Sequence, residues 1–122
     1  MSFDKPHKRL LAWQKSMDLV VLIYDITKSF PREETYGLMS QLRRAAVSVP
    51  SNISEGAAGR SVEQFKNFLS IAIGSLNEVS TQLEIASRIG YLDSIAHDKA
   101  QSLVDECLAL TYGLRKKISG EH

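Results

Sequence analysis

Apolar residues recur along this chain with the spacing of helices. Four segments carry apolar positions three and four residues apart, a pattern typical of an amphipathic α-helix. The first segment has two neighbouring series, one of Trp13, Met17, Val20, Tyr24 and Thr27 and one of Ala12, Ser16, Leu19, Ile23, Ile26 and Phe30. A face this wide predicts contact with more than one neighbouring helix.

The next three segments follow the same pattern and have recognisable ends. Their core-facing residues are Leu38, Leu42, Ala45, Val49 and Ile53; Val62, Phe65, Leu69, Ala72, Leu76, Val79, Leu83 and Ala86; and Ala96, Ala100, Leu103, Cys107, Leu110 and Leu114. Glu33 and Glu34 suit the N-terminal end of the second helix. Ser61, with Gln64 three residues on, suits the start of the third, and Asp93 or Ser94 that of the fourth. We expect left-handed glycines to end the second helix at Gly56–Gly59 and the third at Gly90.

Four helices with short connections predict an all-α, antiparallel up-down-up-down four-helix bundle. The chain of 122 residues is expected to be one domain, residues 1–122, with an ordered core over about residues 8–118. Pro50 lies inside the second helix. Because an interior proline removes a backbone hydrogen bond and clashes with the preceding turn, we predict a proline kink there.

Composition favours a cytoplasmic protein. The net charge is +1 and Cys107 is the single cysteine, which excludes an internal disulfide and fits a reducing compartment. The N-terminal segment MSFDKPHKRL lacks the apolar core of a signal peptide, and no apolar run is long enough to cross a bilayer. Cys107 lies in an apolar series and is expected to be an inert core thiol.

Residue patterns of enzymes and cofactor proteins are missing from the sequence. No glutamate precedes a histidine by three residues, as a di-iron bundle requires. The glycine-containing segment EGAAGRS lacks the Gly-Lys-Ser/Thr of a phosphate loop. No serine or cysteine has a plausible base near it in the sequence. We therefore expect no metal, no cofactor and no catalytic residues.

The segment QLRRAAVSVPSNISEG, residues 41–56, places polar residues on a helix face beside Pro50. Spacing by four puts Arg44, Ser48 and Asn52 on one side. Ser48 and Asn52 could bond backbone groups that the proline frees, and Arg44 could contact Glu78 on the third helix. The predicted site comprises Gln41, Arg43, Arg44, Ser48, Pro50, Asn52, Glu55, Gly56, Glu78 and Gln82. Two interpretations remain open: a polar network that fixes helix register or subunit packing, or a contact with a ligand or nucleic acid.

Basic residues concentrate where the predicted topology brings three chain segments to one end. The candidates for nucleic-acid contact are Lys5, Lys8, Arg9, Arg60, Arg115, Lys116 and Lys117. They could contact phosphates, and an oligomeric ring would multiply those contacts. The alternative is a solvated face whose cations complement a helix C-terminus.

Apolar surface exceeds what one bundle needs, and this favours homo-oligomerisation. Phe68 and Ile71 lie off the main series of the third helix, and the first helix carries its doubled series. Exposed apolar patches of this kind usually mark an interface.

Three stretches resemble a known family: LAWQKSMDLVVLIYDIT, FPREETYGLMSQLRRAAVSVPSNISEG and FKNFLSIAIGSLNEVSTQLEIASRIGYL. They are similar to the bacterial four-helix-bundle proteins linked to 23S ribosomal RNA intervening sequences, also called S23-type ribosomal proteins. The resemblance spans roughly residues 8–117. It implies a four-helix bundle and a homopentamer, as in the related accessory variability determinant proteins, which resemble nucleic-acid-binding partners of a reverse transcriptase.

The sequence thus predicts a non-enzymatic oligomeric bundle that binds structured RNA, or a nucleic-acid-processing partner, through a basic surface. One alternative is a protein-interaction scaffold in which the polar residues of 41–56 lock helices together. The other is a small-molecule-binding protein with its cavity at the Pro50 kink, beside Asn52 and Glu55.

Overall fold

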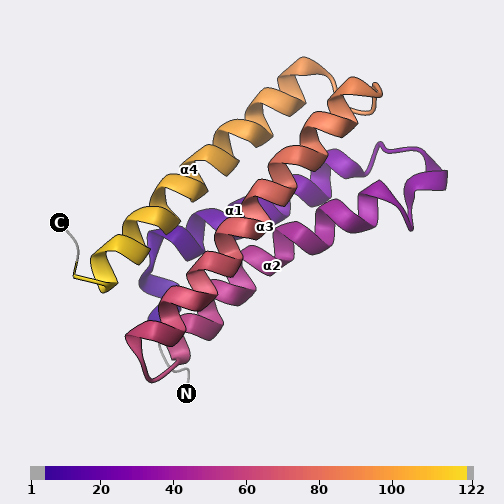
Figure 1. The fold of residues 1–122 in the computed structure, drawn as a ribbon. Helices are drawn as coiled ribbons and strands as arrows, with labels where there is room; N and C mark the ends of the chain where they lie inside the picture. Colours follow the sequence, from indigo (N-terminus) through magenta and orange to yellow (C-terminus); the bar gives the residue numbers. More distant parts are fainter. Residues whose placement is uncertain (1–4, 121–122) are drawn as a thin grey trace.

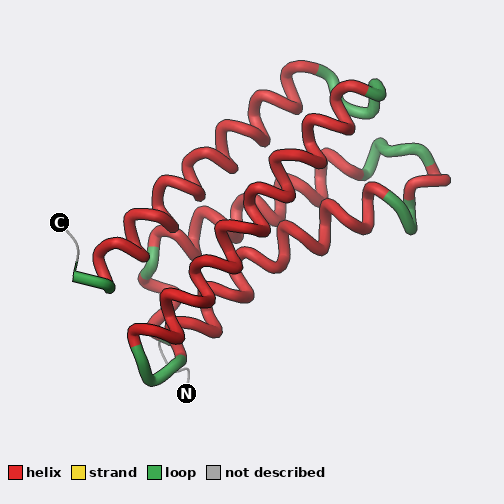
Figure 2. Tube along the Cα trace, viewed as in Figure 1, coloured by secondary structure: helices red, strands yellow, loops and turns green. Residues whose placement is uncertain are grey.

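The computed structural model describes residues 5–120 and contains four long helices (Figure 1). They are α1 (Leu11–Thr27), α2 (Leu38–Ala58), α3 (Val62–Arg88) and α4 (Ser94–Ile118). Two short 3₁₀ helices, η1 (Pro6–Arg9) and η2 (Arg32–Glu34), precede α1 and α2. The described residues include no strand (Figure 2). The predicted all-α, antiparallel four-helix bundle is confirmed.

Each helix packs against two others, because α1 contacts α2 and α4 while α3 contacts α2 and α4. The first helix shows which of its two series faces the core. Leu19 and Ile23 are completely buried, whereas Met17 and Tyr24 of the other series remain exposed. The second series therefore makes most of the core of α1, and the first lies at its boundary with solvent except for Thr27, which is completely buried.

The core face of α4 differs from the predicted one. Val104 and Thr111 are completely buried, whereas Leu103 and Leu110 are only half-buried. Thr111 tolerates burial because its hydroxyl donates to the Cys107 carbonyl at 2.7 Å, so no polar group is left unpaired. The apolar pattern alone could not identify a buried threonine.

Most helix ends form as the sequence predicts. The Ser61 hydroxyl accepts from the Gln64 N–H at 3.1 Å, and the Asp93 carboxylate accepts from the Ala96 N–H at 2.8 Å. Gly90 has a φ of 86°, and beyond it the Tyr91 N–H bonds the Ala86 carbonyl at 2.8 Å. Such a left-handed residue satisfies the last carbonyls of a helix.

The helix α2 ends at Ala58, within the predicted range, but the left-handed glycine expected there is wrong. Gly59 follows the helix in an extended conformation, with φ −70° and ψ 169°. In the described residues the positive-φ glycines are Gly90 and Gly120. The physical reason is the short connection: the chain must run directly into Ser61, which is itself extended as the first residue before α3.

Pro50 lies inside α2, which continues past it to Ala58. Since proline has no N–H, the carbonyl four residues earlier, that of Ala46, loses its helical partner. One residue later the Ser51 hydroxyl donates to the Val47 carbonyl at 2.8 Å. A bend at Pro50 stays a prediction.

The α2–α3 pair is held at close range by small residues. A Cβ added at Gly56 would lie 2.8 Å from Phe65 Cδ1 and 2.9 Å from Phe68 Cβ. These distances are shorter than van der Waals contact, so Gly56 is needed where α3 begins to pack on α2. Phe68, which we expected to support an interface, is half-buried in this contact.

A polar contact joins the two connections at the opposite end of the bundle. The Glu34 carboxylate accepts from the Leu38 N–H at 3.0 Å and from the Tyr91 hydroxyl at 2.9 Å. The pKa of Glu34 is lowered mainly by the hydrogen bond from the Leu38 N–H, and to a smaller extent by the one from the Tyr91 hydroxyl. The same bond to Glu34 raises the pKa of Tyr91. Glu34 thereby caps α2 and ties it to the α3–α4 connection.

Gly56→Ala is predicted to destabilise the fold by about 1–3 kcal/mol, because overpacking displaces Phe65 and Phe68. The matched control is Gly74→Ala in the middle of α3, where an added Cβ meets nothing within 4 Å. That change should stabilise the helix by about 0.5–1 kcal/mol. Urea denaturation followed by circular dichroism measures both, and similar effects would contradict the close packing at Gly56.

Glu34→Gln is predicted to alter the acid stability of the protein. A carboxyl group with a lowered pKa contributes stability that is present above its ordinary pKa and is lost as pH falls through the lowered value. The difference in Tm between wild type and Glu34→Gln should therefore be largest near pH 6–7 and disappear in acid. Thermal melts across the pH series test this, with Glu33→Gln at the exposed neighbour as control. A pH-independent difference would contradict the proposed role of the carboxylate.

Candidate functional site

The predicted basic residues gather at one end of the bundle. The start of α1, the α2–α3 connection and the end of α4 lie together there (Figure 1). The residues at this basic end are Lys5, Lys8, Arg9, Arg60, Arg115, Lys116 and Lys117. The last three occupy the final turn of α4, where cations also complement the negative end of the helix dipole.

A groove between α3 and α4 opens at this end, and we refer to it as the terminal groove. It has a volume of about 530 Å³ and is lined by Glu63, Lys66, Asn67, Ser70, Tyr112, Arg115, Lys116 and Ser119. Most of these residues were absent from the predicted site. Arg115 and Ser70 are 45 positions apart, and only the packing of the two helices reveals that they meet.

Part of the 41–56 segment serves to join helices. Arg43 Nε donates to Thr27 Oγ1 at 2.9 Å, and Arg43 Nη2 donates to the Tyr24 carbonyl at 3.2 Å. Its guanidinium also lies 4.4 Å from the centroid of the Tyr24 ring. Arg43 therefore fastens α2 to the C-terminal end of α1. Thr27 as its partner was missed, because threonine within an apolar series carries no signal of this contact.

Ser48 and Asn52 also form bonds within the bundle. Ser48 Oγ lies 2.8 Å from Ser75 Oγ on α3. Asn52 Nδ2 donates to the Ser48 carbonyl at 2.7 Å and to Ser48 Oγ at 2.9 Å. The predicted role at Pro50 is therefore wrong, because neither side chain reaches the carbonyl that the proline frees. Ser48 instead joins α2 to α3, and Asn52 bonds Ser48 within α2.

The remaining polar residues surround a second groove, between α2 and α3, of about 380 Å³. Arg44 and Glu78 line it with Gln41, Ala45, Ser48 and Ser75. Among the described residues no ion pair joins Arg44 to Glu78, so the predicted contact does not form. Glu78 instead accepts a long bond of 3.5 Å from Gln82 Nε2.

Gln82 is the buried member of this cluster. Its Nε2 also lies 3.4 Å from Gln41 Oε1, while its own Oε1 is buried without a hydrogen-bond partner. Glu55, by contrast, is exposed one turn beyond Asn52 and lines neither groove. The structure thus brings together Gln41, Ser48, Glu78 and Gln82 but leaves Glu55 apart.

Pro50 lines a third groove, on the α1 side of α2. Its volume is about 300 Å³ and its neighbours there are mainly apolar, including Trp13, Met17 and Val47. Asn52 and Glu55 do not line it. The groove at Pro50 thus lies on a different face of α2 from the one that the sequence indicated.

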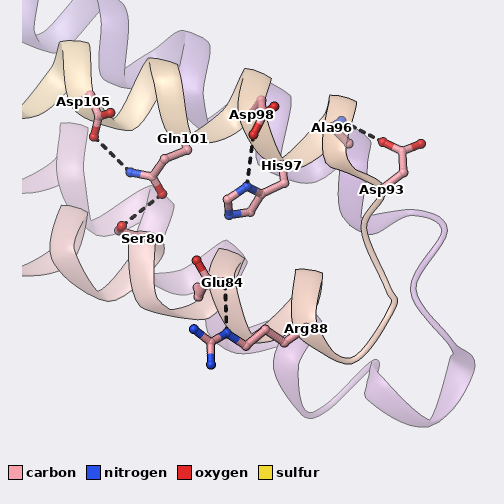
Figure 3. A network of polar contacts seen from close by, with 9 residues as sticks. All are labelled: Ser80, Glu84, Arg88, Asp93, Ala96, His97, Asp98, Gln101 and Asp105. Atoms are coloured by element: carbon pink, nitrogen blue, oxygen red, sulfur yellow. Dashed lines mark hydrogen bonds and ion pairs between the residues drawn. The ribbon is translucent and has the colours of Figure 1, made fainter.

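A separate polar network lies at the other end of α3 and α4 (Figure 3). The Ser80 hydroxyl donates to Gln101 Oε1 at 3.0 Å, and Arg88 pairs with Glu84 at 3.1 Å. His97 Nδ1 lies 3.5 Å from Asp98 Oδ1, and its Nε2 is buried without a partner. Within residues 5–120 no group of three His, Cys, Asp or Glu side chains could hold a metal ion.

Cys107 is completely buried in the core. Burial is the main cause that raises the pKa of its thiol to about 12. Because the thiolate is the nucleophilic form, this cysteine is unreactive at neutral pH.

The neighbouring arginines of α2 should respond differently to substitution. Arg43→Met removes two charge-assisted bonds and is expected to destabilise the protein by about 1–3 kcal/mol. Arg44→Met changes an exposed side chain and should alter stability by less than about 0.5 kcal/mol. Urea denaturation of the two variants tests this, and equal losses would contradict the separate roles of the two residues.

The family model described as 23S rRNA-intervening sequence protein matches residues 8–113. A crystal structure of a protein of unknown function from the S23 ribosomal protein family of Bacteroides thetaiotaomicron VPI-5482 is similar in fold, with a TM-score of 0.78 and 24% identity. The match covers 87% of this chain and 99% of that one. No curated protein matches the sequence.

The described helices include none that is both long and apolar enough to span a membrane. Their arrangement and the match over residues 8–113 agree with the resemblance seen in the sequence. This chain belongs to the 23S rRNA-intervening sequence protein family.

Proposed function

We propose that this protein is a non-enzymatic, homo-oligomeric RNA-binding protein whose basic end contacts RNA phosphates. The observation that carries the proposal is that η1 with Lys8, the α2–α3 connection with Arg60 and the final turn of α4 with Arg115–Lys117 lie at one end of a chain with a net charge of only +1. The family description refers to a 23S rRNA intervening sequence, which supports structured RNA as the ligand class.

Electrostatic contact with phosphates does not require specific readout of bases. Each Lys or Arg that neutralises a phosphate releases condensed counterions, and affinity then falls steeply with salt. The positive residues lie at helix ends and connections, where their side chains can reach an irregular RNA surface. A single bundle offers few such contacts, so repetition in an oligomer would raise the affinity.

Exposed apolar residues support the oligomer. On α1 and α2 the exposed residues Met17 and Val47, with Trp13, line the groove beside Pro50. Val21 is also exposed on α1, and Ile71 on α3. Apolar surface of this kind is typical of an interface. A homopentamer remains the expectation from the family resemblance.

The second candidate function is a protein-interaction scaffold, acting on a nucleic-acid-processing protein. It is favoured by the internal use of the 41–56 segment, since Arg43, Ser48 and Gly56 join helices and Asn52 bonds Ser48 within α2. The small-molecule alternative would use the groove beside Pro50.

We predict that the protein binds a fluorescein-labelled RNA stem-loop with strong salt dependence. Fluorescence anisotropy across 50–300 mM salt should give a log–log slope of several units, about 0.9 for each phosphate contacted. Lys116→Glu with Lys117→Glu should weaken binding at least about tenfold and reduce the slope by about two units. The matched control is Lys28→Glu with Lys99→Glu at the opposite end, which should bind as wild type does.

Absence of binding at 50 mM salt would contradict RNA binding and favour the scaffold. Equal losses in the two double variants would contradict the assignment to the basic end. Light scattering after gel filtration tests assembly separately, since a monomer of 13.6 kDa would contradict the homo-oligomer.

A further inference from the structure

We propose that the terminal groove between α3 and α4 binds an unpaired nucleotide of single-stranded RNA. The phosphate would lie among Lys66, Arg115 and Lys116, and the base would stack on the surface formed by Tyr112 and the Arg115 guanidinium. The inference rests on the proposed RNA binding and names the RNA feature that this part of the basic end recognises.

The charges of the groove suit a phosphate. Three of its side chains, Lys66, Arg115 and Lys116, are cationic, against the single carboxylate of Glu63. Lys66 Nζ lies 3.8 Å from Glu63 Oε1, and the Glu63 side chain is 81% exposed. An exposed pair at that distance is weak, so a phosphate can replace Glu63 as the partner of Lys66.

Arg115 is held in position before any ligand binds. The Ser70 hydroxyl donates to the Lys66 carbonyl at 3.0 Å, which leaves its oxygen to accept from Arg115 Nη1 at 3.0 Å. The guanidinium also lies 5.1 Å from the centroid of the Tyr112 ring. Since a guanidinium has five N–H donors, the others stay free for phosphate oxygens. Little ordering of Arg115 is then required on binding.

Tyr112 distinguishes an unpaired base from a base pair. Its side chain is 46% exposed although it lines the groove. Bases stack on aromatic rings and guanidinium planes when they are unpaired and splayed out, whereas a duplex presents mainly phosphates and sugars. The groove volume of about 530 Å³ lies within the range of pockets that hold small ligands. A phosphate alone would not need the tyrosine.

The test compares a fluorescein-labelled single-stranded oligouridine with a blunt RNA duplex of the same length, by anisotropy at 100 mM salt. Tyr112→Leu should weaken single-strand binding about 5- to 100-fold, the effect of losing one base–aromatic stack. The ratio of single-strand to duplex affinity should fall by a similar factor. The matched control is Tyr36→Leu, since Tyr36 is 96% exposed and lies beyond η2 at the other end; its ratio should stay unchanged.

Two further variants change affinity in opposite directions. Ser70→Ala releases Arg115 and should weaken single-strand binding, whereas Glu63→Gln removes the competing carboxylate and should tighten it. Circular dichroism melts establish that each variant folds. Because the Glu63→Gln variant is expected to gain affinity, a folding defect cannot produce the expected result.

The outcomes separate this inference from the proposed function. If Tyr112→Leu leaves the affinity ratio unchanged while Lys117→Glu still weakens binding of both RNAs, the nucleotide site is wrong and RNA binding by the basic end stands. If wild type binds neither RNA at low salt, both proposals are wrong. If wild type binds the single strand and Tyr112→Leu lowers the affinity ratio, the result supports the terminal groove as the site that binds an unpaired nucleotide.

Discussion

Close packing of α2 on α3 is the constraint on which the rest of this bundle depends. Ser48 and Ser75 meet at 2.8 Å, and Gly56 lies where any side chain would collide with Phe65 and Phe68. Helices can approach this closely only where small residues face each other. These contacts therefore specify the register in which α3 packs along α2. The register of α3 then determines which of its residues face α4. The terminal groove is one result of that register.

The polar residues of 41–56 divide according to their physical tasks. Arg43 bonds Thr27 and the Tyr24 carbonyl at the end of α1, Ser48 bonds Ser75 across the α2–α3 contact, and Asn52 bonds Ser48 within α2. Arg44 lies on the same helix, next to Arg43, yet forms no ion pair with Glu78 in the described chain. A cluster that looks uniform in the sequence therefore contains residues that hold helices together beside residues that remain exposed to solvent.

The basic end shows how a nearly neutral chain can present a local positive surface. The antiparallel topology brings the start of α1, the α2–α3 connection and the end of α4 to one place (Figure 1). Because charges separated by more than about 10 Å are largely screened at ordinary salt, a nearby phosphate responds to these local cations more than to the net charge. The hydrogen bond from Arg115 to Ser70 also holds one of these cations in position. Lysines dispersed over a surface are not held in this way.

The sequence by itself determined the four helices, their antiparallel order, most of their ends and the place where basic residues gather. These features depend on the spacing of apolar residues and on capping groups a few residues apart, and both can be recognised from the sequence alone. Only the tertiary structure decided that Arg43 bonds Thr27, that Thr111 is buried, that the glycine following α2 is extended and that Arg44 forms no ion pair with Glu78 among the described residues. Tertiary structure also created the terminal groove, because Ser70 and Arg115 belong to different helices. The physical reason is that helix periodicity defines which face is apolar, whereas the distance and rotation between packed helices depend on side-chain volumes from both partners at once.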